Sequence, residues 1–145
     1  MARELAEFTL DLESMQHMAL FERQTGVGAV DCLMTPAAAF YVVPEGTLHR
    51  AIGAGKTGLD RLAKKLGRRV EVVELSEDPE RFVRGLFHAY GVEGVAMEDG
   101  PFGRRARVRV DPHRKGSAIG KGGANLNALR VLAQRHAGIA GIVLE

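Results

Sequence analysis

The 145-residue sequence has one cysteine, no tryptophan and no long apolar run. A single thiol, that of Cys32, excludes an internal disulfide framework and a metal site built from several thiolates. The apolar runs fall well short of the ~18 residues that a membrane-spanning helix needs. Residues 1–13 are too acidic, and too interrupted by charge, for a signal or transit peptide. We therefore expect a cytoplasmic protein without membrane attachment.

The sequence also lacks a recognisable catalytic cluster. Its histidines show neither metal-ligand spacing nor an acidic partner at a suggestive distance: His17, His49, His88, His113 and His136. The acidic residues between Glu71 and Glu80 fit the solvated edge of a strand and the start of a helix. We expect no catalytic residue, no metal and no cofactor, and hence a protein that is not an enzyme.

Net charge is small but unevenly distributed. Residues 1–100 carry 11 Lys and Arg against 16 Asp and Glu, whereas residues 101–145 carry 9 against 2. A basic end on an almost neutral chain is the electrostatic pattern of a protein that binds a polyanion. Charge alone favours a simpler interpretation, a solvated basic face, so the motifs must decide.

Hydrophobic periodicity and turn residues predict the same series of elements twice: helix, strand, strand, short helix, glycine loop, helix, strand. In the first half these are residues 11–26, 28–34, 38–44, 45–53, the loop, 57–67 and 68–75. In the second half they are residues 76–91, 92–99, 104–111, 112–120, the loop, 124–138 and 139–145.

The two halves are also similar in sequence at their loops. Residues 51–62 (AIGAGKTGLDRL) align without a gap to residues 118–129 (AIGKGGANLNAL), with six of twelve positions identical. An internal repeat of this kind indicates a duplicated unit. We predict an α+β protein of two domains, residues 1–75 and 76–145, packed rigidly because almost no linker separates them.

The second loop has the features of an anion site. Glycines let the backbone turn sharply and let another backbone come close. The amides that open the following helix lack intrahelical partners and carry the positive end of its dipole, so a phosphate can bind there. The loop Gly120-Lys121-Gly122-Gly123 adds a lysine at its tip, and Ile119 flanks it.

The stretch GSAIGKGGANLNALR, within this order of elements, resembles the KH domain, whose Gly-x-x-Gly loop clamps about four nucleotides of single-stranded nucleic acid. The order helix-strand-strand-helix-helix-strand is similar to the type II form. Together with LDLESMQHMALFERQTGVGAVDC, VVPEG and LGRRVEVVELSEDPERFVRGLF, the tandem arrangement resembles the archaeal NusA-like transcription factors.

The resemblance covers nearly the whole chain and implies function as well as fold. It implies binding of single-stranded RNA in transcription elongation, termination or antitermination, with RNA polymerase or the elongation complex as partner. We expect a monomer. The predicted RNA-binding residues of the second half are Arg114, Lys115, Ile119, Gly120, Lys121, Gly122, Gly123 and Asn125.

The first loop departs from the motif, because Lys56 stands where the second loop has Gly123. The predicted RNA-binding residues there are Ile52, Gly53, Ala54, Gly55 and Lys56. If that position needs a positive φ, a side chain costs on the order of 1 kcal/mol or obstructs a phosphate. The loop either binds through charge or is mainly structural; we favour a weaker but real contribution.

Two other functions are a nucleotide-binding enzyme and a module that binds only protein. Gly55-Lys56-Thr57 matches the end of a nucleotide-binding P-loop, but the first glycine of that motif would fall on Arg50, and the preceding strand ends too far upstream.

The alternative is a KH fold that only holds RNA polymerase or another protein. Alternating arginines argue against it, since they predict one basic strand face: Arg104, Arg105, Arg107 and Arg109. The competing interpretation of these arginines is a solvated strand face paired with acids of the other half, but basic residues that lead into an intact Gly-x-x-Gly loop favour nucleic acid.

Overall fold

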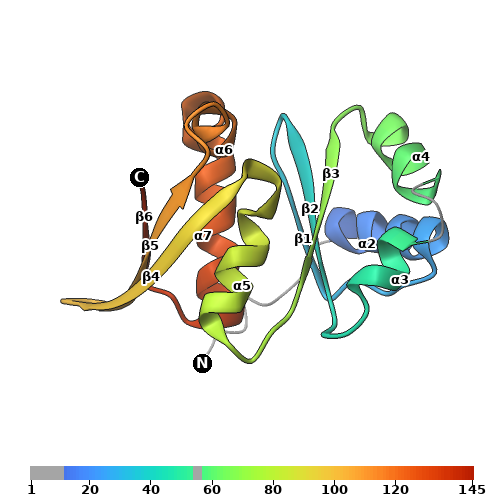
Figure 1. Ribbon diagram of the computed structural model, residues 1–145. Coiled ribbons are helices and arrows are strands. Elements are labelled where there is room, and N and C mark those ends of the chain that lie inside the picture. The colour runs from blue at the N-terminus through green and yellow to red at the C-terminus, as the bar shows by residue number, and fades with distance from the viewer. Residues whose placement is uncertain (1–11, 54–56) are drawn as a thin grey trace.

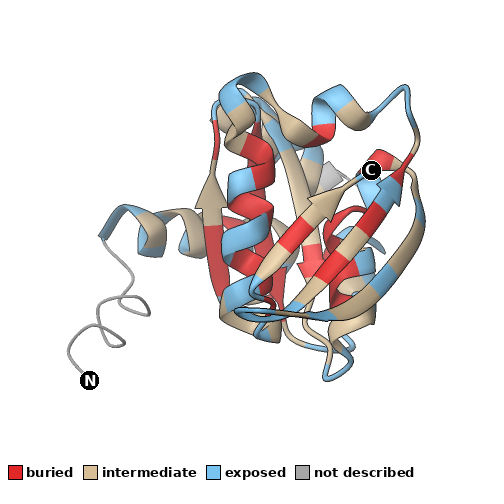
Figure 2. Cartoon of the chain, turned by 90° about the vertical axis from the view of Figure 1, so that its left-hand side faces the viewer, coloured by how far each residue is buried: buried red, intermediate tan, exposed pale blue. Residues whose placement is uncertain are grey.

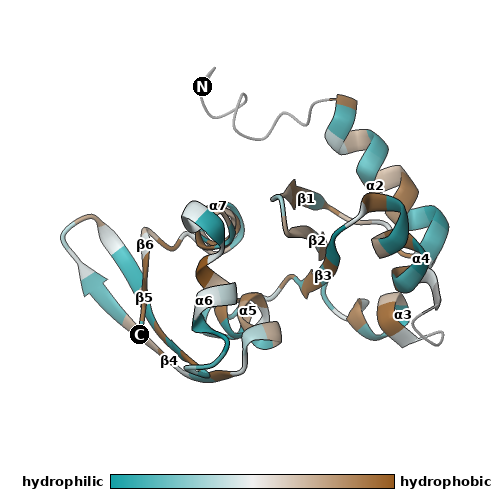
Figure 3. Ribbon diagram, turned by 90° about the horizontal axis from the view of Figure 1, so that it is seen from above, coloured by the Kyte–Doolittle hydropathy of each residue, from teal (hydrophilic) through white to brown (hydrophobic). Residues whose placement is uncertain are grey.

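The computed structural model describes residues 12–53 and 57–145. Within them the chain has a mixed α+β fold with two three-stranded sheets, one formed by each half of the sequence. Four layers follow one another in Figure 1: the sheet of the second half, its helices, the sheet of the first half and its helices. Figure 3 shows the same order from above. The helices of the second half therefore lie between the two sheets.

The first half contains three helices and three strands in the described residues. They are α2 (Leu12–Thr25), β1 (Asp31–Met34), β2 (Ala38–Val43), α3 (Leu48–Gly53), α4 (Thr57–Leu66) and β3 (Arg69–Glu74). Strand β2 is central, antiparallel to β1 and parallel to β3.

The second half repeats this arrangement. Its elements are α5 (Pro79–Leu86), the 3₁₀ turn η1 (His88–Tyr90), β4 (Val92–Gly100), β5 (Gly103–Val110), α6 (Lys115–Ile119), the 3₁₀ turn η2 (Lys121–Gly123), α7 (Ala124–Ala137) and β6 (Gly141–Leu144). Strand β5 is central, antiparallel to β4 and parallel to β6. The order of elements expected from the sequence is confirmed in the described part of the chain.

One helix is shorter than its sequence pattern predicts. The expected helix 76–91 divides into α5 and the turn η1, which Gly91 caps at its C-terminal end. Asp78 sets the start, because its side chain accepts a hydrogen bond from the backbone N–H of Glu80 at 3.0 Å. Pro79 follows at the first helical position, where a missing N–H costs nothing.

Strand β2 is buried on both faces, and successive residues therefore enter two different cores. Ala39, Tyr41 and Val43 pack with Phe21 and other residues of the first-half helices. The opposite face of β2 packs into the core of the second half, which includes helices α5 and α7 and strand β5. Its residues there are Ala38, Phe40 and Val42. The two halves thus share a continuous apolar interface.

Strand β5 alternates instead between core and surface. Ala106, Val108 and Val110 are buried, and the residues between them are partly or fully exposed. Figure 2 shows such an alternation of red with paler residues along the strands of the outer sheet. Burial of one face only is typical of a sheet that covers the end of a stack of layers.

A buried ion cluster also joins the halves. Asp31 on β1 is 2% exposed and contacts the end of α7. Its Oδ2 lies 3.1 Å from Nη1 of Arg135 and 2.8 Å from Nε2 of His136. Burial opposes ionisation of Asp31, but the hydrogen bonds and charges of His136 and Arg135 outweigh it, so the pKa of Asp31 lies below its ordinary value.

Residues 12–53 and 57–145 contain neither a candidate membrane-spanning helix nor a candidate metal site. No helix there combines the length and the apolar character that crossing a membrane requires. No three His, Cys, Asp or Glu side chains of the same residues gather in a way that could hold a metal ion.

Candidate nucleic-acid interface

The loop between α6 and α7 has a backbone that depends on glycine. Gly120, Gly122 and Gly123 have φ values of +76°, +65° and +78°. Residues other than glycine rarely adopt this left-handed region of backbone conformation. The loop is short and tight, since the N–H of Gly123 donates to the carbonyl of Gly120 at 3.0 Å. Lys121 and Gly122 are exposed at its tip.

The glycines of this loop differ in what surrounds them. A Cβ on Gly120 would lie 2.9 Å from Cβ of Asn125 and 3.0 Å from its backbone nitrogen. A Cβ on Gly122 would meet nothing within 4 Å. Gly120 is therefore required for packing within the protein, whereas the space above Gly122 is open to a ligand.

Substituting alanine at these two glycines should separate the two roles. We expect Gly120→Ala to lower the free energy of unfolding by about 2 kcal/mol, because a positive φ and a close contact act together. Gly122→Ala should cost about 1 kcal/mol, from backbone strain alone. Urea denaturation of both variants measures this difference; equal losses would contradict the assignment of Gly120 to packing.

The start of α7 is electrostatically suited to an anion. Gly123 occupies the N-cap position, no side chain caps the helix, and its first turn holds no acidic residue. The 14-residue helix therefore presents its positive dipole end beside the exposed Lys121. Backbone amides, dipole and lysine together form a site that a phosphate can occupy.

The basic residues before the loop are partly engaged. Arg114 lies 3.8 Å from Oδ2 of Asp111, and its Nη1 donates to the carbonyl of Ala89 at 3.4 Å. Lys115 opens α6 and is half-buried. Ile119 is also half-buried and packs against the core of the second half. Of the residues predicted around this loop, Lys121 and Gly122 are the most open to a ligand.

Asn125 occupies a different position from the one its sequence context suggested. The sequence predicted an RNA contact, but Asn125 is 1% exposed and its amide forms hydrogen bonds within the protein. Its Oδ1 accepts from the hydroxyl of Thr35 at 2.7 Å, and its Nδ2 donates to the hydroxyl of Tyr90 at 3.1 Å. Nδ2 also donates to the carbonyl of Ser117 at 3.1 Å. The side chain holds parts of the protein together rather than facing solvent.

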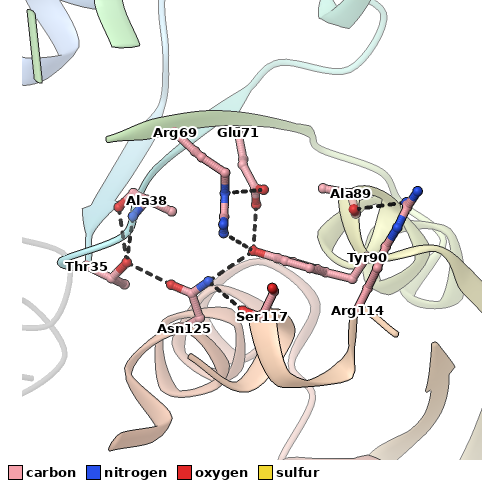
Figure 4. A network of polar contacts seen from close by, with 9 residues as sticks. All are labelled: Thr35, Ala38, Arg69, Glu71, Ala89, Tyr90, Arg114, Ser117 and Asn125. Atoms are coloured by element: carbon pink, nitrogen blue, oxygen red, sulfur yellow. Dashed lines mark hydrogen bonds and ion pairs between the residues drawn. The ribbon is translucent and has the colours of Figure 1, made fainter. Parts of the chain in front are cut away.

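Tyr90 extends this network to strand β3 (Figure 4). Its hydroxyl donates to Oε2 of Glu71 at 3.0 Å and accepts from Nη2 of Arg69 at 3.1 Å. Burial raises the pKa of Glu71, although the hydrogen bond from Tyr90 and the charge of Arg69 offset part of that effect. Burial also raises the pKa of Tyr90. The sequence did not predict the position of Tyr90 in this network, because it lies 19 residues from Glu71 and 35 residues from Asn125.

At the first loop the structure places Ile52 and Gly53, which end helix α3. Ile52 is 37% exposed. The other predicted residues of this loop, Ala54, Gly55 and Lys56, lie outside the described residues. Their contribution to binding stays a prediction.

A mostly apolar groove of about 420 Å³ adjoins Ile52. One wall comes from the first half and includes Leu59 and Ala63 of α4 with Val70 and Val72 of β3. The other wall comes from α5 and η1 of the second half. The sequence did not predict this groove, because its walls come from both halves and it forms only when they dock.

Three arginines of β5, namely Arg105, Arg107 and Arg109, lie on the face of the outer sheet that points away from the helices. Arg105 and Arg107 contact Oε1 of Glu98 at 2.8 and 3.2 Å. Two weaker pairs continue the row, Arg107 with Glu145 at 3.4 Å and Arg109 with Glu93 at 3.5 Å. The hydrogen bond from Arg105 and the charge of Arg107 lower the pKa of Glu98. The arginine side chains are thus balanced by acids of their own sheet.

The structure corrects the prediction that four arginines share one basic face. Within residues 12–53 and 57–145, Arg105, Arg107 and Arg109 form ion pairs with acids of the second half, and they lie on the opposite side of the sheet from α6 and α7. Arg104 does not share their face, because it is an even number of residues from the buried Ala106 and Val108. The basic strand face and the glycine loop are therefore separate features.

The chain is similar in sequence to known proteins over most of its length. No protein-family model matches the chain. A probable transcription termination protein NusA of Halobacterium salinarum is 36% identical over 132 residues, which is 91% of this chain and 94% of that protein. The protein of the same description from Halococcus morrhuae is 33% identical over 136 residues, or 94% and 97% of the two chains. The chain belongs to the NusA family.

The NusA match extends over both halves of the chain. The relative from Thermoplasma acidophilum, also described as a probable transcription termination protein NusA, is 28% identical over 98% of this chain and 99% of its own. Among solved structures, the crystal structure of APE1850 superposes with a TM-score of 0.67 at 32% identity, over 94% of this chain and all of the other. The similarity to the NusA-like proteins expected from the sequence is confirmed.

Proposed function

We propose that this NusA-family chain binds single-stranded RNA during transcription termination, antitermination or elongation. The observation that carries the proposal is the loop Gly120–Gly123. Its three positive-φ glycines, its exposed Lys121 and the uncapped start of α7 form a site for a backbone phosphate. The relatives are described as probable transcription termination proteins, which supports the process we assign.

The fold supports a more specific proposal, that of two tandem type II KH domains, residues 1–75 and 76–145. Each half has the order helix-strand-strand-helix-helix-strand and a sheet with one antiparallel and one parallel pair. A KH domain binds RNA by clamping the backbone at the loop between its two central helices. The second domain would supply the stronger clamp.

The first domain would contribute mainly a surface for bases. Its loop lacks the closing glycine, but the apolar groove beside Ile52 lies along α4 and β3. Unstacked bases are apolar on their faces and fit such a groove. Because both halves line the groove, one RNA strand could contact both domains, and the second contact would gain from effective concentration. RNA polymerase is the partner that we propose for this complex.

Salt dependence tests the proposed function. If the loop and its neighbours neutralise three or four phosphates, log K should fall with log salt at a slope of about −2 to −3, since each phosphate contributes about −0.7 on a single strand. Fluorescence anisotropy of short RNA oligomers, with DNA oligomers of the same sequence alongside, measures the slope and the preference for RNA. A flat response, or no binding to any oligomer, would instead favour a protein-binding role.

A further inference from the structure

We propose that Asn125 is the positioning residue of the Gly120–Gly123 loop, and that Thr35 and Tyr90 hold Asn125 in place. The loop that we assign to RNA would then take its shape from a contact with the other half of the chain. The statement about RNA affinity rests on the proposed function. The statement about loop geometry does not.

The first step is the contact between Asn125 and the loop itself. Asn125 lies in the first turn of α7, two residues after Gly123, and its Cβ lies under Gly120 at a distance that leaves no room for another side chain. Its Nδ2 donates to the carbonyl of Ser117 on α6 at 3.1 Å. The side chain therefore ties together the two helices that the loop connects.

The second step is that the glycine loop needs a contact of this kind to hold one conformation. Three glycines in four residues give the loop more backbone freedom than other residues would. The backbone bonds of the loop are local, from Gly120 to Gly116 and from Gly123 to Gly120. These bonds set the turn, whereas the amide of Asn125 adds a direct hydrogen bond between α6 and α7, whose apolar residues also pack in one core.

The third step is the set of contacts that orients the amide (Figure 4). The carbonyl of Ser117 can only accept, so the NH₂ of Asn125 must face it. Oδ1 then faces the hydroxyl of Thr35 at 2.7 Å, and the second N–H faces the hydroxyl of Tyr90 at 3.1 Å. Thr35 also accepts from the N–H of Ala38 at 3.0 Å, which anchors it in the turn before β2. Ser117 thus fixes the orientation of the amide, and Thr35 of the first half holds its oxygen in place.

Removing one hydroxyl from this network tests the proposal, and the chain supplies a matched control. Tyr90→Phe deletes the hydroxyl that accepts from Asn125. Tyr41→Phe deletes an equally buried hydroxyl that has no hydrogen-bond partner among the described residues. The backbone amide NMR signals of Gly120, Gly122 and Gly123 should shift in Tyr90→Phe and stay in place in Tyr41→Phe.

RNA affinity gives the second readout, measured well below the unfolding temperature of every variant. We expect Tyr90→Phe and Thr35→Val to weaken binding roughly three- to tenfold, the effect of one buried hydrogen bond. Thr35→Ser keeps the hydroxyl and should restore wild-type affinity. In the Lys121→Asp/Gly122→Asp background, Tyr90→Phe should cause no further loss, because its effect passes through the loop.

Each outcome bears on the proposal. If the network served stability alone, Tyr90→Phe would unfold at lower urea with unchanged loop signals and affinity, which would overturn it. Shifted loop signals with unchanged affinity would overturn the claim that the network sets the binding geometry. If the wild-type protein bound no RNA, the proposed function would fail, and the glycine signals would still decide whether Asn125 positions the loop.

Discussion

Replacing Lys121 and Gly122 by aspartate should reduce RNA affinity at least about a hundredfold while the protein stays folded. The two changes place negative charge where a phosphate is expected and remove the cation beside it. A hydrogen bond to a charged group contributes about 1.5–3 kcal/mol, so losing two of them accounts for an effect of this size. The fold should tolerate the change, because Lys121 is exposed and a Cβ on Gly122 meets nothing within 4 Å.

The control variant changes the net charge by the same amount and also replaces a positive-φ glycine, but at a distance from the loop. Gly138 has a φ of +65°, and a Cβ there also meets nothing within 4 Å. Arg109 is exposed on the outer sheet, away from the loop. Arg109→Asp/Gly138→Asp should therefore bind RNA nearly as well as the wild type. Anisotropy titrations compare the two, with circular dichroism to verify folding; equal losses would show that overall charge, not the loop, governs binding.

Asp31→Asn should lower the free energy of unfolding by about 3 kcal/mol at pH 7. Asp31 is buried, and its neutralisation leaves Arg135 and His136 without their anionic partner at the junction of the two halves. Breaking a buried ion pair by removing one member costs about 3–5 kcal/mol. The lower end applies because Arg135 and His136 retain some contact with water. Urea denaturation measures the loss.

The same residue predicts a pH dependence. The pKa of Asp31 is lower in the folded protein than its ordinary value, so the unfolded chain binds a proton more readily. Its contribution to stability is complete above the unfolded pKa of about 3.9 and is lost as pH falls through the folded pKa. Asp31→Asn should flatten this part of the acid-unfolding curve.

Glu98→Gln is the matched control for Asp31→Asn. Glu98 also contacts two cationic side chains and has a lowered pKa, but it lies on the solvated face of the outer sheet. Its replacement should leave the free energy of unfolding almost unchanged, as is usual for surface ion pairs. A large loss from Glu98→Gln, or none from Asp31→Asn, would contradict the importance of burial in this comparison.

The parts of the fold that could be predicted are those encoded by neighbouring residues. The loop Gly120–Gly123 is visible as a motif because the local backbone requires its glycines. Each of them has a positive φ, and Asn125 lies too close to Gly120 for a side chain there. The order of helices and strands follows from periodicity for the same reason. Both kinds of signal lie within a dozen residues of chain.

Contacts between distant segments could not be predicted. Thr35 and Asn125 are 90 residues apart, and the polar character of Asn125 indicates equally a base contact or a buried hydrogen bond. The arginines of β5 looked like a nucleic-acid surface because the positions of their acidic partners, on β4 and just after β6, depend on strand register. The groove beside Ile52 needs both halves. In each case the missing information was how distant elements pair and dock.

The central strands of the two units differ in the face that points away from the helices of their own unit. The offset that aligns the two loops also places Ala38, Phe40 and Val42 of β2 over Arg105, Arg107 and Arg109 of β5. In the first unit this face is apolar and covered by the next unit, and in the second it carries charge. Stacked repeats need a polar terminal face to stay soluble. The arginine row of β5 therefore gives the outer face of the second sheet the polar character that a terminal face of a stack needs.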